Sequence, residues 1–262
     1  MPASIPLWPD TPPHFDAGDG FVPQLDLYPL TGQRAAGAIV IFPGGGYGHR
    51  ADHEGEPVAR MFNDAGYHAF VAQYRVAPNR HPVPLLDAVR AVRLVRQRAG
   101  EWGVRPDRVG VLGFSAGGHL AASISTLHAG VPAAVADEVE AQPCRPDLSI
   151  LCYPVITSGE FAHRGSFDNL LGSDATEQER ATLSLETRVD GATPPAFLWH
   201  TAADAGVPVE NSLLYAGALS RQGTRFELHV YPEGSHGLGL APDHPHVATW
   251  AGLAVEWLGE MG

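Results

Sequence analysis

Short apolar runs alternate with helix-like segments along most of this 262-residue chain. The runs have the length and the content of β-branched residues that are typical of buried strands. They lie at 38–42, 67–74, 109–114, 148–153, 196–199 and 225–231, and an earlier, alternating run of the kind found at a sheet edge lies at 22–28. Because strands that alternate with helices pair in parallel, the pattern predicts a mostly parallel central sheet with helices on both faces.

The helices between these strands are predicted from apolar positions at helical spacing. The clearest case is 84–98, where apolar residues recur every three or four positions and arginines occupy the other face. Further helices are expected at 57–64, 118–123, 209–222 and 247–258. No Ser/Gly-rich or charged linker divides the chain, so we expect residues 1–262 to form a single α/β domain.

Two segments depart from this rhythm. Residues 1–20 are rich in proline, which predicts an irregular arm laid over the surface. Residues 157–195 are polar and mostly helix-compatible, and they stand between two predicted strands. A connection of that length is typical of a lid or binding segment, so we interpret it as a short substrate-binding insertion.

The sequence Gly113-Phe114-Ser115-Ala116-Gly117 lies where the strand 109–114 meets the next helix. A G-x-S-x-G motif in that setting is a nucleophile elbow, in which a tight turn lifts the serine hydroxyl clear of the sheet. The Ala116 amide then lies at a helix start, where unpaired N–H groups favour a developing negative charge. A tight structural turn with an incidental serine is the alternative, and the strand-to-helix context argues against it.

Composition narrows the possible functions. The 17 basic and 29 acidic residues give a net charge of −12, which disfavours a nucleic-acid partner and suits a neutral small molecule. Every basic residue is arginine, so Schiff-base chemistry on lysine and a Walker A loop are both excluded.

Cysteine usage and hydropathy bear on redox state and location. Cys144 and Cys152 match no disulfide or zinc pattern and are expected to be free, buried thiols. Residues 1–10 lack the basic and apolar regions of a signal peptide, and no apolar run is long enough for a membrane span. For the sequence as given, we expect a cytoplasmic protein with no membrane partner.

A serine nucleophile needs a base, and the base needs an acid to orient it. His236 lies in a glycine-flanked loop after the strand 225–231, and Asp204 follows the strand 196–199. Both positions are at the carboxyl edge of a parallel sheet, as is Ser115, and the chain order Ser, Asp, His suits this arrangement. His200 and His229 are expected to have structural roles within strands, and Asp190 and Asp243 are the weaker candidates for the acid.

The loop after the strand 38–42 reads Pro43-Gly44-Gly45-Gly46-Tyr47. Backbone amides approach a substrate closely where no side chain intervenes, so Gly45 and Gly46 are predicted to complete an oxyanion hole with Ala116. A nucleotide-binding loop is the rejected alternative, because the third glycine of G-x-G-x-x-G would fall on His49.

Three further histidines need an interpretation. His49 and His53, four residues apart, have the spacing of a metal pair, but no third ligand is evident and we expect no metal site. His119 is expected to form hydrogen bonds within the elbow helix.

Taken together, these motifs permit an identification. The triple-glycine loop, the Gly113–Ala121 segment, Asp204 with Val207-Pro208, and Ser235-His236-Gly237 resemble those of the α/β-hydrolase superfamily. Within it, nearly the whole chain is similar to the acetyl xylan esterase-like and feruloyl esterase-like carbohydrate esterases of BD-FAE type. Members often carry two adjacent aspartates where this chain has Ala203-Asp204, and the second of them is retained here.

The resemblance implies a serine esterase that removes small acyl groups, chiefly acetyl, from sugars. It also implies the triad Ser115, Asp204 and His236. We expect the walls of the substrate site at 157–195 and around 47–53, with Tyr47 as a substrate-binding residue, and a two-step acyl transfer by such a triad requires no metal or organic cofactor. A peptidase or amidase of the same fold and an inactive hydrolase-fold binding module are the alternatives. Neither acyl length, the alcohol nor the oligomeric state follows from the sequence.

Overall fold

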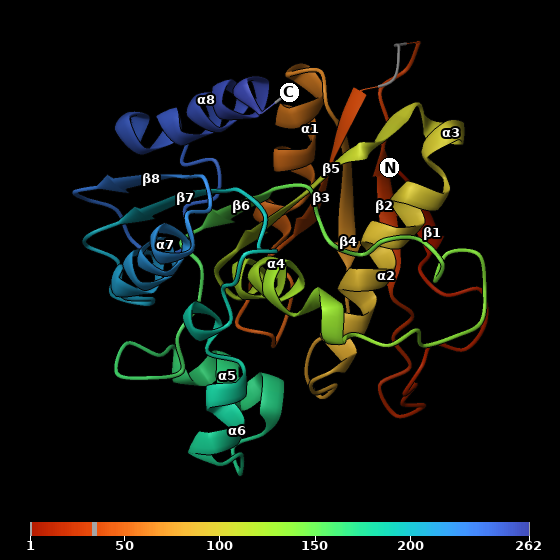
Figure 1. Cartoon of the computed structure of the whole chain (residues 1–262), viewed down its shortest axis with the longest axis horizontal. Helices are drawn as coiled ribbons and strands as arrows, with labels where there is room; N and C mark the ends of the chain where they lie inside the picture. The colour runs from red at the N-terminus through yellow and green to blue at the C-terminus, as the bar shows by residue number, and fades with distance from the viewer. Residues whose placement is uncertain (1, 33–35, 262) are drawn as a thin grey trace.

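A twisted eight-stranded sheet runs through the molecule in this computed structural model, which describes residues 2–32 and 36–261 (Figure 1). The strand order is β1-β2-β4-β3-β5-β6-β7-β8; β1 and β2 pair antiparallel, and all strands from β4 to β8 across the sheet run parallel. The strands are β1 (Ala3–Pro6), β2 (Gln24–Tyr28), β3 (Ala36–Phe42), β4 (His68–Gln73), β5 (Val104–Phe114), β6 (Ser149–Cys152), β7 (Ala196–Thr201) and β8 (Phe226–Tyr231).

Helices cover both faces of this sheet, as predicted. α1 and α8 lie on one face, whereas α2, α4 and α7 lie on the other (Figure 1). The helices are α1 (Glu56–Asp64), α2 (Val83–Gln97), α3 (Ala99–Trp102), α4 (Ser115–Leu127), α5 (Arg164–Leu171), α6 (Glu177–Thr182), α7 (Glu210–Gln222) and α8 (Pro245–Glu260), with short 3₁₀ turns η1 (Asp52–Glu54), η2 (His128–Gly130) and η3 (Leu185–Thr187).

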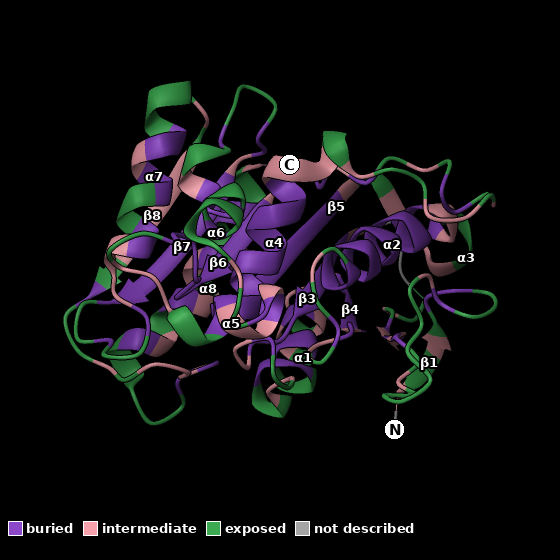
Figure 2. Cartoon of the chain, turned by 90° about the horizontal axis from the view of Figure 1, so that it is seen from below, coloured by how far each residue is buried: buried purple, intermediate pink, exposed green. Residues whose placement is uncertain are grey.

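The central strands β3, β4, β6 and β7 are largely apolar because both of their faces are buried. In β3, Val40 belongs to the core beneath α2 and α4, while its neighbours Ile39 and Ile41 belong to the core beneath α1 and α8. Figure 2 shows the central strands and the inner faces of the helices as buried, whereas the edge strand β1 is largely exposed. The continuous apolar runs in the sequence therefore report a sheet that is covered on both sides.

The predicted irregular arm at residues 1–20 is wrong for its first part. β1 adds an antiparallel edge strand to β2, so β2 is not itself at the edge; Met1 lies outside the described residues. Leu7 and Trp8 follow β1 and are almost fully buried, and the Trp8 indole donates to Asp87 Oδ1 at 2.8 Å. The burial of these two large side chains against α2 holds the segment in place.

The insertion 157–195 carries α5, α6 and η3 and lies between β6 and β7. Its residues Phe167, Leu170, Leu183 and Leu185 belong to the same core as α2 and α4.

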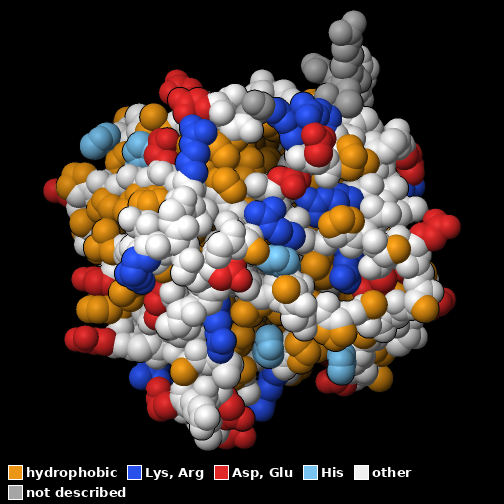
Figure 3. Space-filling view, in the orientation of Figure 1, with side chains coloured by type: hydrophobic (Ala, Val, Ile, Leu, Met, Phe, Trp, Pro, Cys, Tyr) orange, Lys and Arg blue, Asp and Glu red, His pale blue; other side chains and the backbone are white. Residues whose placement is uncertain are grey.

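On the face shown in Figure 3, acidic and basic side chains are interspersed rather than gathered into one field. None of the helices in the described part of the chain combines the length and the apolar character needed to cross a membrane.

One ion pair is fully enclosed between β4 and α2. The Arg75 guanidinium donates to Asp87 Oδ1 at 2.7 Å and to Oδ2 at 2.8 Å, and both side chains are at most 1% exposed. Removing one partner of such a pair leaves an uncompensated buried charge.

We therefore expect Asp87→Asn to lower the free energy of unfolding by about 3–5 kcal/mol, measured by urea denaturation. Glu56→Gln is the matched control, because the Glu56–Arg60 pair lies on an exposed surface. Its loss should cost less than about 1 kcal/mol. Equal effects of the two substitutions would contradict this account.

Candidate active site

Ser115 sits in a strained turn between β5 and α4, with a backbone φ of +52°. A side chain is not tolerated on either flanking glycine. A Cβ on Gly113 would overlap the Gly117 carbonyl, and a Cβ on Gly117 would overlap the Phe42 carbonyl at the end of β3. The two glycines of the motif therefore permit a crossing so close that Ser115 is held at the edge of the sheet.

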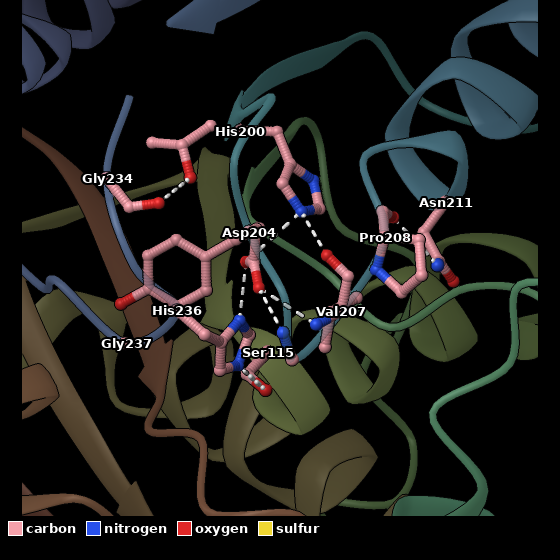
Figure 4. A network of polar contacts seen from close by, with 12 residues as sticks. Ser115, His200, Asp204, Val207, Pro208, Asn211, Gly234, His236 and Gly237 are labelled. Atoms are coloured by element: carbon pink, nitrogen blue, oxygen red, sulfur yellow. Dashed lines mark hydrogen bonds and ion pairs between the residues drawn. The ribbon is translucent and has the colours of Figure 1, made fainter. Parts of the chain in front are cut away.

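The structure brings the three predicted triad side chains together (Figure 4). His236 Nε2 lies 2.7 Å from Ser115 Oγ, and His236 Nδ1 lies 2.7 Å from Asp204 Oδ2. A carboxylate only accepts hydrogen bonds, so Nδ1 carries the proton and Nε2 is free to accept the serine proton. This tautomer is the one a general base requires.

Asp204 is held as a carboxylate in a buried turn after β7. Its side chain is 1% exposed, and Oδ1 accepts the backbone N–H groups of Gly206 at 2.8 Å and Val207 at 2.9 Å. Burial acts to raise the pKa of Asp204, but hydrogen bonds from His200, His236 and the Val207 amide outweigh it and hold the pKa well below its usual range.

His200, in β7, contacts Oδ2 of the Asp204 carboxylate, the oxygen that the His236 ring also approaches. Its Nε2 lies 2.9 Å from the Val207 carbonyl and 3.4 Å from Asp204 Oδ2, both of them acceptors, so this nitrogen carries a proton. The structural role predicted for His200 is thus correct, although its contact with the acid was not foreseen.

The loop after β8 that carries His236, called the histidine loop below, is hydrogen-bonded to β7, the strand that precedes Asp204. The Thr201 hydroxyl donates to the Gly234 carbonyl at 2.9 Å, and Gly206 lies where a Cβ would come within 3.0 Å of His236 Cβ. Aspartate and histidine, which are 32 residues apart, are thereby fixed side by side (Figure 4).

The triple-glycine loop has all its carbonyls engaged. The acceptors and their donors are Pro43 O with the Tyr74 hydroxyl, Gly44 O with Ala51 N, Gly45 O with Gly48 N and His49 N, Gly46 O with Asn169 Nδ2, and Tyr47 O with Ala77 N. The amides of Gly45 and Gly46, in contrast, donate to no protein acceptor within the described residues. In a trans peptide the N–H points opposite to the preceding carbonyl, so fixing the Gly44 and Gly45 carbonyls also fixes the two free N–H groups.

This loop lies against the serine turn. A Cβ placed on Gly44 would come within 3.1 Å of Ser115 Cβ and 2.8 Å of the Phe114 carbonyl. The Ala116 amide, in the first turn of α4, is one of the N–H groups that the helix itself leaves unpaired. The start of the triple-glycine loop and the first turn of α4 thus meet at Ser115.

Tyr47 points inward rather than toward solvent. It is 1% exposed, and its hydroxyl lies 2.9 Å from His119 Nδ1. Its predicted contact with substrate therefore stays untested, and what the structure shows is a support for the loop.

The expectation for His119 is wrong. Its ring forms no hydrogen bond within α4. Instead, Nδ1 contacts the hydroxyl of Tyr47 in the triple-glycine loop, and Nε2 lies 3.0 Å from the Leu183 carbonyl of the insertion. A buried imidazole seeks acceptors and donors wherever packing supplies them, and here they come from distant segments.

Among the described residues, His49 and His53 belong to no group of three or more potential metal-ligating side chains. His53 Nε2 instead lies 2.9 Å from the Gly237 carbonyl, next to His236. Cys144 and Cys152 are free and buried, as predicted.

Sequence reasoning missed three side chains that hold the site together: Glu54, Tyr153 and Asn169. Each is a single polar residue in an unremarkable stretch, and no periodicity or motif marks it. Glu54 contacts Tyr153 across 99 residues of chain, Tyr153 contacts Gly239 across 86, and Asn169 contacts Gly46 across 123.

The parallel sheet and the serine turn with its acid and base partners define this chain as an α/β hydrolase, which confirms the predicted fold class. More narrowly, it belongs to the BD-FAE family, whose family model matches residues 25–219. The resemblance noted from the sequence is thereby confirmed.

Individual relatives share this fold and much of the sequence. The chain is 36% identical over 250 residues to endo-1,4-beta-xylanase B of Butyrivibrio fibrisolvens, covering 94% of this chain and 39% of that protein. It is 36% identical over 231 residues to an acetylxylan esterase of Xylanibacter ruminicola, covering 86% of this chain and 44% of that protein. The chain thus spans less than half the length of these two relatives.

A solved structure matches over nearly the whole chain. The acetyl ester-xyloside bifunctional hydrolase of Caldicellulosiruptor lactoaceticus superposes with a TM-score of 0.96 at 50% identity, covering 99% of this chain and 96% of that one.

The environment of His119 generates a prediction about stability and pH. Burial lowers the pKa of His119 to about 4, against about 6.5 for an exposed histidine. Between these two values the unfolded chain binds the proton and the folded chain does not, so stability falls as the pH falls from 6.5 toward 4. His119 alone should contribute a loss of about 2 kcal/mol between pH 7.5 and pH 5.

Urea denaturation of the wild type and of His119→Gln at several pH values checks this. The variant should lose stability less steeply in that window, because other histidines still titrate but this one does not. Parallel curves for the two proteins would contradict the assignment.

Proposed function

We propose that this chain is a serine carboxylic ester hydrolase that removes short acyl groups, chiefly acetyl, from acetylated sugars such as xylo-oligosaccharides. The observation that carries the proposal is the hydrogen-bonded chain Asp204–His236–Ser115. Beside it lies the triple-glycine loop, from here on the oxyanion loop, in which the Gly45 and Gly46 amides have no acceptor among the described residues. Relatives named acetylxylan esterase and acetyl ester-xyloside hydrolase support the choice of acetyl and of a sugar alcohol.

In the first step the Ser115 oxygen attacks the ester carbonyl while His236 Nε2 takes its proton. The resulting tetrahedral oxyanion is bound by the N–H groups of Ala116, Gly45 and Gly46. Because the carbonyl of each of these peptide groups is already hydrogen-bonded, the N–H donors need not reorganise as the charge develops. The bond between the carbonyl carbon and the sugar oxygen then breaks as His236 protonates that oxygen. The sugar leaves as the free alcohol, and the acyl group stays on Ser115 as the acyl-enzyme.

In the second step water takes the place of the alcohol. His236 removes a proton from this water, which attacks the acyl-enzyme, and Ser115 is regenerated with release of the acid. The Asp204 carboxylate stabilises the imidazolium that forms in both steps. Every proton is moved by a side chain of the triad, so the proposed reaction needs no metal or organic cofactor.

The insertion 157–195 is proposed to form a wall of the substrate site. α5 lies over the oxyanion loop: Asn169 holds the Gly46 carbonyl at 2.8 Å, and a Cβ on Gly46 would lie 3.9 Å from Ser166 Oγ. A wall so close to the oxyanion donors limits the room for an acyl chain, which favours acetyl.

A cytoplasmic location and a single domain over residues 1–262 remain part of the proposal.

Ser115→Ala should reduce kcat for p-nitrophenyl acetate by a factor on the order of 10⁵ to 10⁶, because the nucleophile is lost while the fold is kept. Ser125→Ala is the matched control: Ser125 is a buried serine of the same helix whose hydroxyl bonds to the Ala121 carbonyl. Covalent labelling by an organophosphonate ester should occur in the control and not in Ser115→Ala. Full activity of Ser115→Ala would refute the proposed nucleophile.

The substrate class is tested by a hydrolysis panel at equal concentrations. Acetyl, butyryl and octanoyl esters are compared with acetylated xylo-oligosaccharides, a feruloyl ester and an amide with the same acetyl group. We expect kcat/KM to fall as the acyl chain lengthens and the acetylated saccharide to be hydrolysed. Preference for octanoyl would indicate a general esterase, preference for the amide would indicate a peptidase or amidase, and no turnover would favour a binding module.

A further inference from the structure

A buried carboxylate lies behind the oxyanion loop and takes no part in the proposed proton transfers. The side chain of Glu54, in η1, is 3% exposed. Its Oε2 accepts the Gly44 amide at 2.7 Å, and its Oε1 accepts the Tyr153 hydroxyl at 2.7 Å. One carboxylate thus holds the first glycine of the oxyanion loop and a tyrosine from the end of β6.

Tyr153 continues this connection to the histidine loop. Its hydroxyl accepts the Gly239 amide at 2.8 Å, and its ring packs edge-on to the His236 imidazole with ring centroids 5.0 Å apart. The backbone φ of Tyr153 is +35°, a conformation that a non-glycine residue rarely adopts. The residue is therefore held where its hydroxyl can bridge the two loops.

His53 adds a second bridge between the same segments. Its Nε2 lies 2.9 Å from the Gly237 carbonyl and 3.7 Å from Glu54 Oε1. His53 thus contacts the histidine loop directly at Gly237, and Glu54 reaches it at Gly239 through Tyr153, both within three residues of His236.

The bridge through Glu54 and Tyr153 requires, at position 54, a side chain that accepts two hydrogen bonds and donates none. Glu54 receives one N–H and one O–H, and an ionised carboxylate is the only side-chain group that accepts on both oxygens. Burial, reinforced by the negative charge of Glu54, raises the pKa of Tyr153, which keeps the hydroxyl protonated and able to donate. A glutamine at position 54 would set an N–H group against one of these two donors.

We propose that Glu54 is a positioning residue for the hydrolysis: through Tyr153 it fixes the oxyanion loop relative to the loop that carries His236. This inference rests on the proposed function, because it assumes that those two loops act on the same ester. Glu54 touches neither the reacting atoms nor the substrate, and it acts through the alignment of groups that do.

The expected consequence is a loss of kcat without a matching change in KM. The walls that bind the ground-state ester are not altered, whereas oxyanion donors and general base are used together only in the transition state. Misplacement of such groups by a fraction of an ångström to 1 Å lowers rates by about ten- to a hundredfold.

The experiment compares Glu54→Gln, Tyr153→Phe and the double variant with the wild type. We measure kcat and KM for p-nitrophenyl acetate, the rate of organophosphonate labelling at Ser115, and the urea midpoint of each protein. Tyr215→Phe is the matched control, since Tyr215 is a fully buried tyrosine of α7 whose hydroxyl has no hydrogen-bond partner among the described residues.

Each single variant should lose about ten- to a hundredfold in kcat with KM changed less than about threefold. The double variant should be no slower than the slower single variant, because both substitutions break the same bridge. Tyr215→Phe should keep the wild-type kcat. If Glu54→Gln does not fold, Tyr153→Phe decides the question, because it removes a single oxygen atom.

Wild-type kcat in folded Glu54→Gln or Tyr153→Phe, a loss confined to KM, or losses that multiply in the double variant would each overturn the inference. The proposed function fails separately, through the absence of ester turnover by the wild type. In that event the labelling rate of Ser115 still tests the positioning, and equal labelling of Tyr153→Phe and wild type would overturn it.

Discussion

The close crossing of the β5–α4 turn over the end of β3 is the constraint on which the rest of the site depends. Because Gly117 lies against the Phe42 carbonyl, the nucleophile and the start of the oxyanion loop are brought within van der Waals contact. The loop after β3 then has no space for side chains where it faces Ser115. A larger residue at either glycine of the turn would separate the hydroxyl from the amides.

The site separates backbone donors from backbone acceptors. The carbonyls from Pro43 to Tyr47 all accept hydrogen bonds from the protein, whereas the amides of Gly45 and Gly46 have no acceptor among the residues that the structure describes. In the proposed reaction, a carbonyl that turned toward the ester would repel its developing negative charge. The hydrogen bonds to these carbonyls fix the orientation of the peptide dipoles in the loop.

Particular elements show how far sequence reasoning extends. The parallel strands and their helices follow from apolar periodicity, and the predicted triad side chains lie within hydrogen-bonding distance in the structure. The edge strand β1 was missed because its proline-rich surroundings carry no strand pattern, and it is fixed instead by Leu7 and Trp8 packing on α2. His119 was misassigned because the partners of a buried imidazole come from segments remote in the chain.

The sequence by itself determined the chain order of the parallel strands and of the long helices beside them, the serine turn, and the placement of its candidate partners at one edge of the sheet. These features depend on local spacing and on the rule that parallel strands end on the same side. Only the tertiary structure decided which isolated polar residues, such as Glu54 and Asn169, orient the loops of that edge. Hydrogen bonds between segments about a hundred residues apart leave no periodic trace in a sequence, because they are set by where the packed elements come to lie.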